Sequence, residues 1–181
     1  MIYVFLANGF EETEAIAPID MLRRAKLDVK TVGVGTKTPV SSHGLPVTAD
    51  ITADEVKLDG SLQLIVLPGG MPGTLNLKGS ETVQKAIAYC VENNIPVGAI
   101  CAAPSILGDL GLLEGRNAVC FPGFEKNLLG AKVQNTLCVT DGQFTTACGA
   151  GAALVFGLEL VKVLCGAEKS EEIRRAIVAD R

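Results

Sequence analysis

Three short apolar runs, each ending in turn residues and followed by a helical pattern, constrain this chain more than any other sequence feature. The runs are Ile2 to Leu6, Leu62 to Leu67 and Val97 to Ile100. Such continuous or near-continuous apolar runs are typical of strands covered on both faces, as in parallel sheets. The alternation of strand and helix predicts one α/β domain over residues 1–181, with a doubly wound, mostly parallel sheet and helices on both faces.

Local patterns predict the remaining elements. Further strands are expected at Val29 to Gly33 and Ala118 to Cys120, and hairpins at Pro39 to Ile51, turning at Ser41 to Gly44, and at Leu137 to Thr146, turning at Asp141-Gly142. Helices are expected from the Glu11 region, where Pro18 should delay or kink the helix, at Ser80 to Asn93, Glu125 to Leu129 and Gly151 to Leu164, and at Ser170 to Ala179 with Ser170 as its cap.

Cys101 stands between the Val97 to Ile100 strand and a helix-compatible segment, Ala102 to Leu107. A side chain at such a joint lies on a tight turn at the carboxyl edge of the sheet, where open α/β folds bind ligands. The amides that open the next helix favour a thiolate and a bound oxyanion. This pattern predicts a cysteine nucleophile elbow. The alternative is a buried structural thiol, because free cysteine is among the most buried residue types.

The loops after the three apolar strands are expected to open on one edge of the sheet, where Glu14, Gly70 and Cys101 would meet. The loop Pro68 to Gly73 is rich in glycine, so it can offer N–H groups to an oxyanion; a plain tight turn is the alternative. Glu11 and Glu12 are interpreted as ordinary partners of the helix dipole.

Charge and cysteine content limit the classes of function. The net charge of −4 gives no broad basic surface for nucleic acid or anionic membranes, which leaves a small metabolite or a protein surface as the partner. Six cysteines without CxxC spacing and a single histidine, His43, argue against a zinc site and a disulfide scaffold. The first apolar run lacks a basic leader and no later run is long enough to span a bilayer, so a cytoplasmic protein is expected.

The usual histidine base of a cysteine hydrolase is missing from the expected positions. Ala102 follows the cysteine, Phe121 occupies a later turn, and His43 is expected to be an exposed turn residue. Glycine patterns near 33–35 and 149–154 lack the context of a dinucleotide site, so no nucleotide cofactor is expected. The remaining proton partner is Glu14, which we expect to be protonated beside a thiol that ionises more readily than a free one.

Five segments together resemble the ThiJ/PfpI superfamily, in particular the branch of the parkinsonism-associated redox protein and its bacterial relatives. These segments are Asn8 to Glu14, Pro18 to Arg24, Val66 to Gly70, Ala99 to Pro104 and Thr146 to Gly151. The resemblance covers essentially the whole chain. It implies a flavodoxin-like three-layer sandwich, similar to class I glutamine amidotransferases, and a homodimer.

The resemblance also implies roles for individual residues. Cys101 matches the reactive cysteine and Glu14 its protonated partner, while the amides of Gly70 and Ala102 match an oxyanion cradle. Gly69, Gly149 and Ala150 line the same pocket. Cys120 and Cys148 lie in segments that approach the site, where either packing or a resolving thiol is open. Some relatives carry histidine where this chain has Phe121, so a more apolar pocket is expected.

Two functions follow as hypotheses. In the first, the resemblance implies a cofactor-free, metal-free glyoxalase or deglycase that converts small 2-oxoaldehydes such as methylglyoxal to hydroxyacids through Cys101 and Glu14. In the second, oxidation of Cys101 to a sulfinate switches a stress sensor or chaperone. A peptidase is disfavoured because no histidine base accompanies the cysteine.

Overall fold

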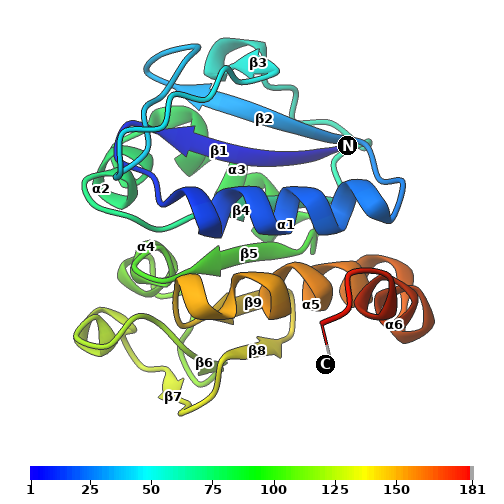
Figure 1. Ribbon diagram of the computed structural model, residues 1–181. Coiled ribbons are helices and arrows are strands. Elements are labelled where there is room, and N and C mark those ends of the chain that lie inside the picture. The colour runs from blue at the N-terminus through cyan, green and yellow to red at the C-terminus, as the bar shows by residue number, and fades with distance from the viewer. Residues whose placement is uncertain (180–181) are drawn as a thin grey trace.

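The computed structural model describes residues 1–179 and is built around a seven-stranded sheet (Figure 1). Its strand order is β3-β2-β1-β4-β5-β9-β8, and all neighbours are parallel except β8 and β9. The strands are β1 (Ile2–Ala7), β2 (Val29–Val34), β3 (Ile51–Thr52), β4 (Leu64–Leu67), β5 (Val97–Ile100), β8 (Cys138–Asp141) and β9 (Phe144–Ala147). The predicted α/β class and mostly parallel sheet are confirmed.

Helices cover both faces of the sheet, which makes three layers (Figure 1). One apolar cluster lies under α2 (Gly73–Lys78), α3 (Glu81–Glu92) and α4 (Pro104–Asp109), and the other under α1 (Glu12–Arg24), α5 (Ala153–Cys165) and α6 (Ala167–Ala176). Every residue of β1, β4 and β5 is buried, as their uninterrupted apolar sequences predict. The core thus fixes the three strands whose ends carry the candidate site.

Strands β1, β4 and β5 are adjacent and parallel, so their carboxyl ends meet at one edge. The chain turns back from β1 and β2 to β4 on the other side of β1, which creates the crevice where doubly wound folds bind ligands. The loops that follow Ala7, Leu67 and Ile100 therefore lie together. This arrangement confirms the predicted common edge.

Helix α1 runs without interruption through Pro18, so the predicted late start is wrong. Pro18 lacks the N–H that would bond one turn back, yet its side chain is buried. It packs with Met21 against Gly157 of α5, where an added Cβ would lie 2.9 Å from the Pro18 Cα and 2.8 Å from the Met21 Cγ. Close packing of the two helices compensates for the missing hydrogen bond.

The predicted hairpin over Pro39 to Ile51 forms in part: the N–H groups of Ser41, Val47 and Ala49 donate to the oxygens of Leu45, Pro39 and Lys37, and an antiparallel bridge joins Val40 to Pro46. Ile51 instead starts β3, which pairs in parallel with β2. Proline at 39 and 46 has no N–H to extend a ladder. The turn at Ser41 to Gly44 also forms as expected, so the error is confined to the carboxyl end of the segment.

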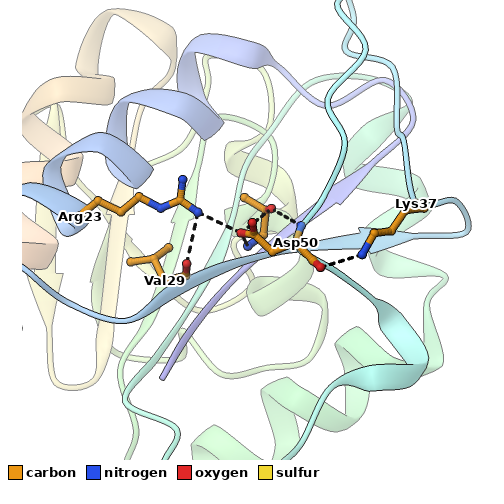
Figure 2. Close-up of polar contacts among 5 residues, drawn as sticks. Arg23, Val29, Lys37 and Asp50 are labelled. Atoms are coloured by element: carbon orange, nitrogen blue, oxygen red, sulfur yellow. Dashed lines mark hydrogen bonds and ion pairs between the residues drawn. The ribbon is translucent and has the colours of Figure 1, made fainter.

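Asp50 attaches this edge segment to the body of the domain (Figure 2). Its Oδ2 accepts hydrogen bonds from the Thr31 N–H at 2.8 Å and from the Arg23 guanidinium at 2.9 Å, while its backbone oxygen accepts one from Lys37 Nζ at 2.7 Å. Arg23 also donates to the Val29 oxygen at 3.3 Å. The long loop that carries His43 is therefore anchored at its carboxyl end.

Other expectations hold with shifted boundaries. Ser80 caps α3 through the Val83 N–H, and the Asp141-Gly142 hairpin joins β8 to β9. The strand expected at Ala118 to Cys120 is shorter, since β6 (Asn117–Ala118) pairs with β7 (Lys132–Val133) in a separate two-stranded sheet. Within residues 1–179, three short 3-10 helices complete the elements, at Ala53–Glu55, Glu125–Asn127 and Ala150–Ala152.

Ser170 does not cap the last helix, contrary to prediction. Helix α6 begins at Ala167, and Ser170 is buried inside it with its hydroxyl donating to the Leu158 oxygen at 2.8 Å. The hydroxyl joins α6 to α5. A serine that precedes an amphipathic run looks the same in sequence whether it caps the helix or lies one turn inside it.

Candidate functional site

Cys101 occupies the predicted joint between β5 and α4, with a positive φ of 65°. This conformation is rare for a residue with a side chain and costs roughly 1–3 kcal/mol, a strain that is typical of functional turns. The turn is held on both sides, because the Cys101 N–H donates to Ala147 at 2.9 Å and its oxygen accepts the Phe121 N–H at 2.8 Å. Cys101 itself is half-buried, so the joint has the geometry of a nucleophile elbow.

Glu14 reaches the same point from the first turn of α1. Its carboxyl group is 1% exposed, and Oε2 accepts a hydrogen bond from the Gly69 N–H at 3.0 Å. Further hydrogen bonds link the carboxyl to the Cys101 thiol and to the Ala150 backbone. Glu11 caps α1 by accepting the Glu14 N–H at 2.7 Å, which fixes the start of the helix. The two residues singled out by the sequence are thus in contact.

Glycine is required where the β4 loop passes between the carboxyl and the thiol. A Cβ at Gly69 would lie 2.5 Å from Glu14 Oε2 and 2.6 Å from the Cys101 Cβ. Gly70 has a φ of 88°, and a Cβ there would lie 2.4 Å from the Glu11 nitrogen. These close approaches let the backbone amides of the loop face the site.

Burial shifts the titration of both partners. Desolvation raises the pKa of Glu14 to about 7, against hydrogen bonds from Cys101, Gly69 and Ala150 that favour the charged carboxylate. The pKa of Cys101 is raised to about 12. Desolvation is the largest cause, and the charge of Glu14 and its hydrogen bond raise the pKa further, while the amides of Gly70 and Ala102 lower it. The expected easy ionisation of the thiol is therefore wrong for the resting pair.

The raised pKa of the thiol depends in part on a charged Glu14. Two of its causes, repulsion by the carboxylate and the hydrogen bond to it, disappear when Glu14 carries the proton. The amides of Gly70 and Ala102 then face the sulfur alone. Above a pH of about 7, where Glu14 has lost its proton, its carboxylate can accept the thiol proton while the sulfur attacks a substrate.

Gly149 and Phe121 form the opposite side of the site. Gly149 has a φ of 156° and precedes the short 3-10 helix at Ala150. A Cβ at this glycine would lie 3.2 Å from the Phe121 Cδ2 and 3.9 Å from Glu14 Oε1. The predicted pocket residues Gly69, Gly70, Ala102, Gly149 and Ala150 are all brought to the Cys101–Glu14 pair.

His43 and Glu12, which the sequence offered no reason to pair, are in contact. His43 is exposed, as expected, and its Nδ1 lies 2.9 Å from Glu12 Oε1. Glu11, Glu12 and His43 offer ligand atoms within 4.8 Å of one another, a spacing that a metal ion could use. These groups already pair with each other and with the end of α1. In the sequence, the feature related to this contact is the turn at Ser41 to Gly44. In the structure this turn packs against the loop that follows β1.

Two further cysteines line a neighbouring cavity of about 540 Å³. Cys120 is buried and Cys148 is half-buried, and Glu125 contributes a carboxylate to the same wall. Burial, followed by the charge of Glu125, raises the pKa of Cys120 to about 11. Neither residue is shown to resolve an oxidised Cys101, so that role stays a prediction.

Among residues 1–179, no helix has the length and apolar character to cross a membrane.

Comparisons with known proteins agree with this geometry. A family model described as the DJ-1/PfpI family matches residues 1–163. The chain is 35% identical over 176 residues to the DJ-1 homolog B of Arabidopsis thaliana, covering 96% of this chain and 40% of that protein. It thus spans about two fifths of that relative's length.

Two other relatives match over nearly their full length. The deglycase PfpI of Pyrococcus furiosus is 31% identical over 163 residues, which is 87% of this chain and 95% of that protein. A DJ-1 superfamily protein from Salmonella typhimurium, solved as a cysteine-to-alanine variant, superposes with a TM-score of 0.91 at 33% identity, covering 98% of this chain and 97% of that one. These matches support the fold and the overall arrangement of the elements that carry the site.

Proposed function

The chain belongs to the DJ-1/PfpI family, and from this membership and the contact between Cys101 and Glu14 we propose a cysteine-dependent stress-response enzyme that acts on reactive 2-oxoaldehydes. The single observation that carries the proposal is the buried carboxyl hydrogen-bonded to a thiol on a strained turn. The deglycase name of the Pyrococcus furiosus relative supports a role of the same type. The substrate class is the one that the resemblance to this family implies, and the chemistry of the pair is suited to it.

The first step is addition of the Cys101 sulfur to the aldehyde carbon. The thiol proton moves to Glu14 as the carbon–sulfur bond forms, so no free thiolate has to accumulate. The carbonyl oxygen becomes an oxyanion, which the N–H groups of Gly70 and Ala102 stabilise. Glu14 then returns its proton to that oxygen, which gives a hemithioacetal.

The second step is an internal transfer of hydrogen. The Glu14 carboxylate removes the proton from the former aldehyde carbon and delivers it to the neighbouring carbonyl carbon, through an enediolate held by the same amides, while the hydroxyl proton on the first carbon passes to the oxygen of the second. The product is a thioester of a 2-hydroxyacid, which water hydrolyses to the acid and the free Cys101 thiol. Methylglyoxal plus water gives lactate, so the sequence needs no external oxidant or reductant.

Purified protein incubated with methylglyoxal tests this proposal. We expect lactate to form with the unmodified chain, and its rate to fall at least 100-fold in Cys101→Ser and Glu14→Gln, because both groups touch the reacting atoms. Cys165→Ser is the matched control, since Cys165 is an exposed thiol at the end of α5. Equal lactate formation by Cys101→Ser would exclude the proposal.

A second candidate function is a redox sensor that uses the same pair. A sulfinate at Cys101 would need a hydrogen-bond donor, and a carboxyl whose pKa is raised to about 7 supplies one near neutral pH. Mild peroxide should then add two oxygen atoms at Cys101 more readily than at any other cysteine. Selective sulfinate formation without any turnover of methylglyoxal would favour the sensor over the enzyme.

A further inference from the structure

The aromatic ring of Phe121 and the carboxyl of Glu14 face each other across the missing side chain of Gly149. A Cβ at that glycine would touch both, at 3.2 Å from Phe121 Cδ2 and 3.9 Å from Glu14 Oε1. The ring of Phe121 therefore packs against the backbone of Gly149, on the same side of the site as the Glu14 carboxyl. A substrate held on Cys101 would lie beside this carboxyl, and its substituent would be close to the ring of Phe121.

The position of Phe121 is fixed although its side chain is open to solvent. Its N–H donates to the Cys101 oxygen at 2.8 Å, and its own oxygen accepts the Phe124 N–H at 3.1 Å in a turn. The side chain is nevertheless 47% exposed. An exposed aromatic ring on a backbone tied to the nucleophile is a surface that a ligand can cover, whereas a ring with a purely structural role would be buried.

We infer that Phe121 determines substrate specificity, and that the Cys101 site favours 2-oxoaldehydes carrying an aromatic or bulky apolar substituent over glyoxal itself. The inference rests on the proposed function and adds to it the class of substituent. The substituent would stack on the ring while the aldehyde carbon meets the sulfur. Glyoxal has only hydrogen in this position and gains nothing from the ring.

The expected size of the effect is modest and measurable. Aromatic pairs contribute beyond simple burial by an amount that corresponds to about a two- to tenfold preference. Phenylglyoxal and glyoxal differ in intrinsic reactivity, so the informative quantity is the ratio of their kcat/KM values and its change on mutation. That ratio cancels general effects of a substitution on the nucleophile.

The first experiment compares this ratio in four proteins. We expect Phe121→Ala to lower the ratio about two- to tenfold and Phe121→Tyr to keep it, because tyrosine preserves the stacking face. Leu110→Ala is the matched control, since Leu110 is also 47% exposed and lies at the carboxyl end of α4. A ratio unchanged in Phe121→Ala, or lowered equally by Leu110→Ala, would overturn the inference.

A second experiment does not depend on turnover. Cys101 is alkylated with iodoacetamide or with 2-iodo-N-phenylacetamide, and the rates are read by mass spectrometry, with Cys165 in the same molecule as the internal reference. Relative to Cys165, the phenyl reagent should alkylate Cys101 faster than iodoacetamide does. This advantage in rate should disappear in Phe121→Ala. If the ratio of alkylation rates depends on Phe121 while no aldehyde is turned over, the proposed function is wrong and the inference of an apolar binding site at Phe121 is supported. If aldehydes are turned over and neither ratio depends on Phe121, the inference fails and the proposed function stands.

Discussion

The Glu14 carboxyl on α1 is hydrogen-bonded to the Cys101 thiol at the end of β5, two elements that are distant in sequence and adjacent at the sheet edge. Gly69 lies close to both residues, and its N–H donates to Glu14 at 3.0 Å. Because the carboxyl is 1% exposed, its charge is costly in the folded state. This cost connects the chemistry of the site to the stability of the domain.

Glu14 should make the protein less stable as the pH rises. Its pKa is 4.5 in the unfolded chain and about 7 in the folded one, so the folded state binds more protons between these values. The free energy of unfolding should therefore fall by about 3 kcal/mol as the pH rises from 4.5 through 7, and the loss from this group is complete about one pH unit above 7. Glu14→Gln should remove this fall.

Urea unfolding at pH 5 and pH 7.5 measures this effect, with exposed Glu92→Gln as the control. The unmodified chain and Glu92→Gln should lose the same free energy between the two pH values, and Glu14→Gln should lose less. If all three proteins show parallel dependence on pH, Glu14 does not titrate in this range in the folded state.

Gly69→Ala should damage both stability and the site. The new Cβ would lie 2.5 Å from Glu14 Oε2 and 2.9 Å from the Ile100 oxygen, so the loop must move. We expect a loss of about 1–3 kcal/mol in the free energy of unfolding and an altered alkylation rate at Cys101. Gly60→Ala is the matched control, because a Cβ there meets nothing within 4 Å. Equal stability of the two variants would show that the loop accommodates a methyl group at position 69 without strain.

Asp50→Ala should release the segment that carries His43. The Thr31 N–H, in a buried residue, would lose its acceptor at 2.8 Å, and Arg23 would lose its partner (Figure 2). We expect a loss of about 1–3 kcal/mol by urea unfolding. Asp20→Ala breaks only an exposed pair with Arg24 and should cost less than about 0.5 kcal/mol. Similar losses in both variants would mean that Asp50 does not anchor this edge.

The sheet and the meeting point of Glu14 with Cys101 could be predicted from the sequence, because buried strands such as Val97–Ile100 have a strong apolar signal and parallel topology fixes which loops meet. The errors lie where tertiary contacts outweigh local preference. Pro18 stays helical because Gly157 lets α5 approach closely, and Ser170 serves a neighbouring helix instead of its own start.

The titration of the thiol could not be predicted from the sequence for a different reason. A helix start and two amides favour a thiolate, but the sequence does not report how deeply Cys101 and Glu14 are buried, and burial dominates the pKa of both. The contact between His43 and Glu12 was also missed, since it depends on a loop held by hydrogen bonds to Asp50 and to the first loop.

The rate of alkylation of Cys101 as a function of pH, in the unmodified chain and in Glu14→Gln, tests most directly whether the two residues act as one unit. We predict an inflection near pH 7 in the unmodified chain, where Glu14 loses its proton and its charge begins to oppose ionisation of the thiol, and no such inflection in Glu14→Gln. Two superimposable profiles would contradict the coupling and remove Glu14 from the site.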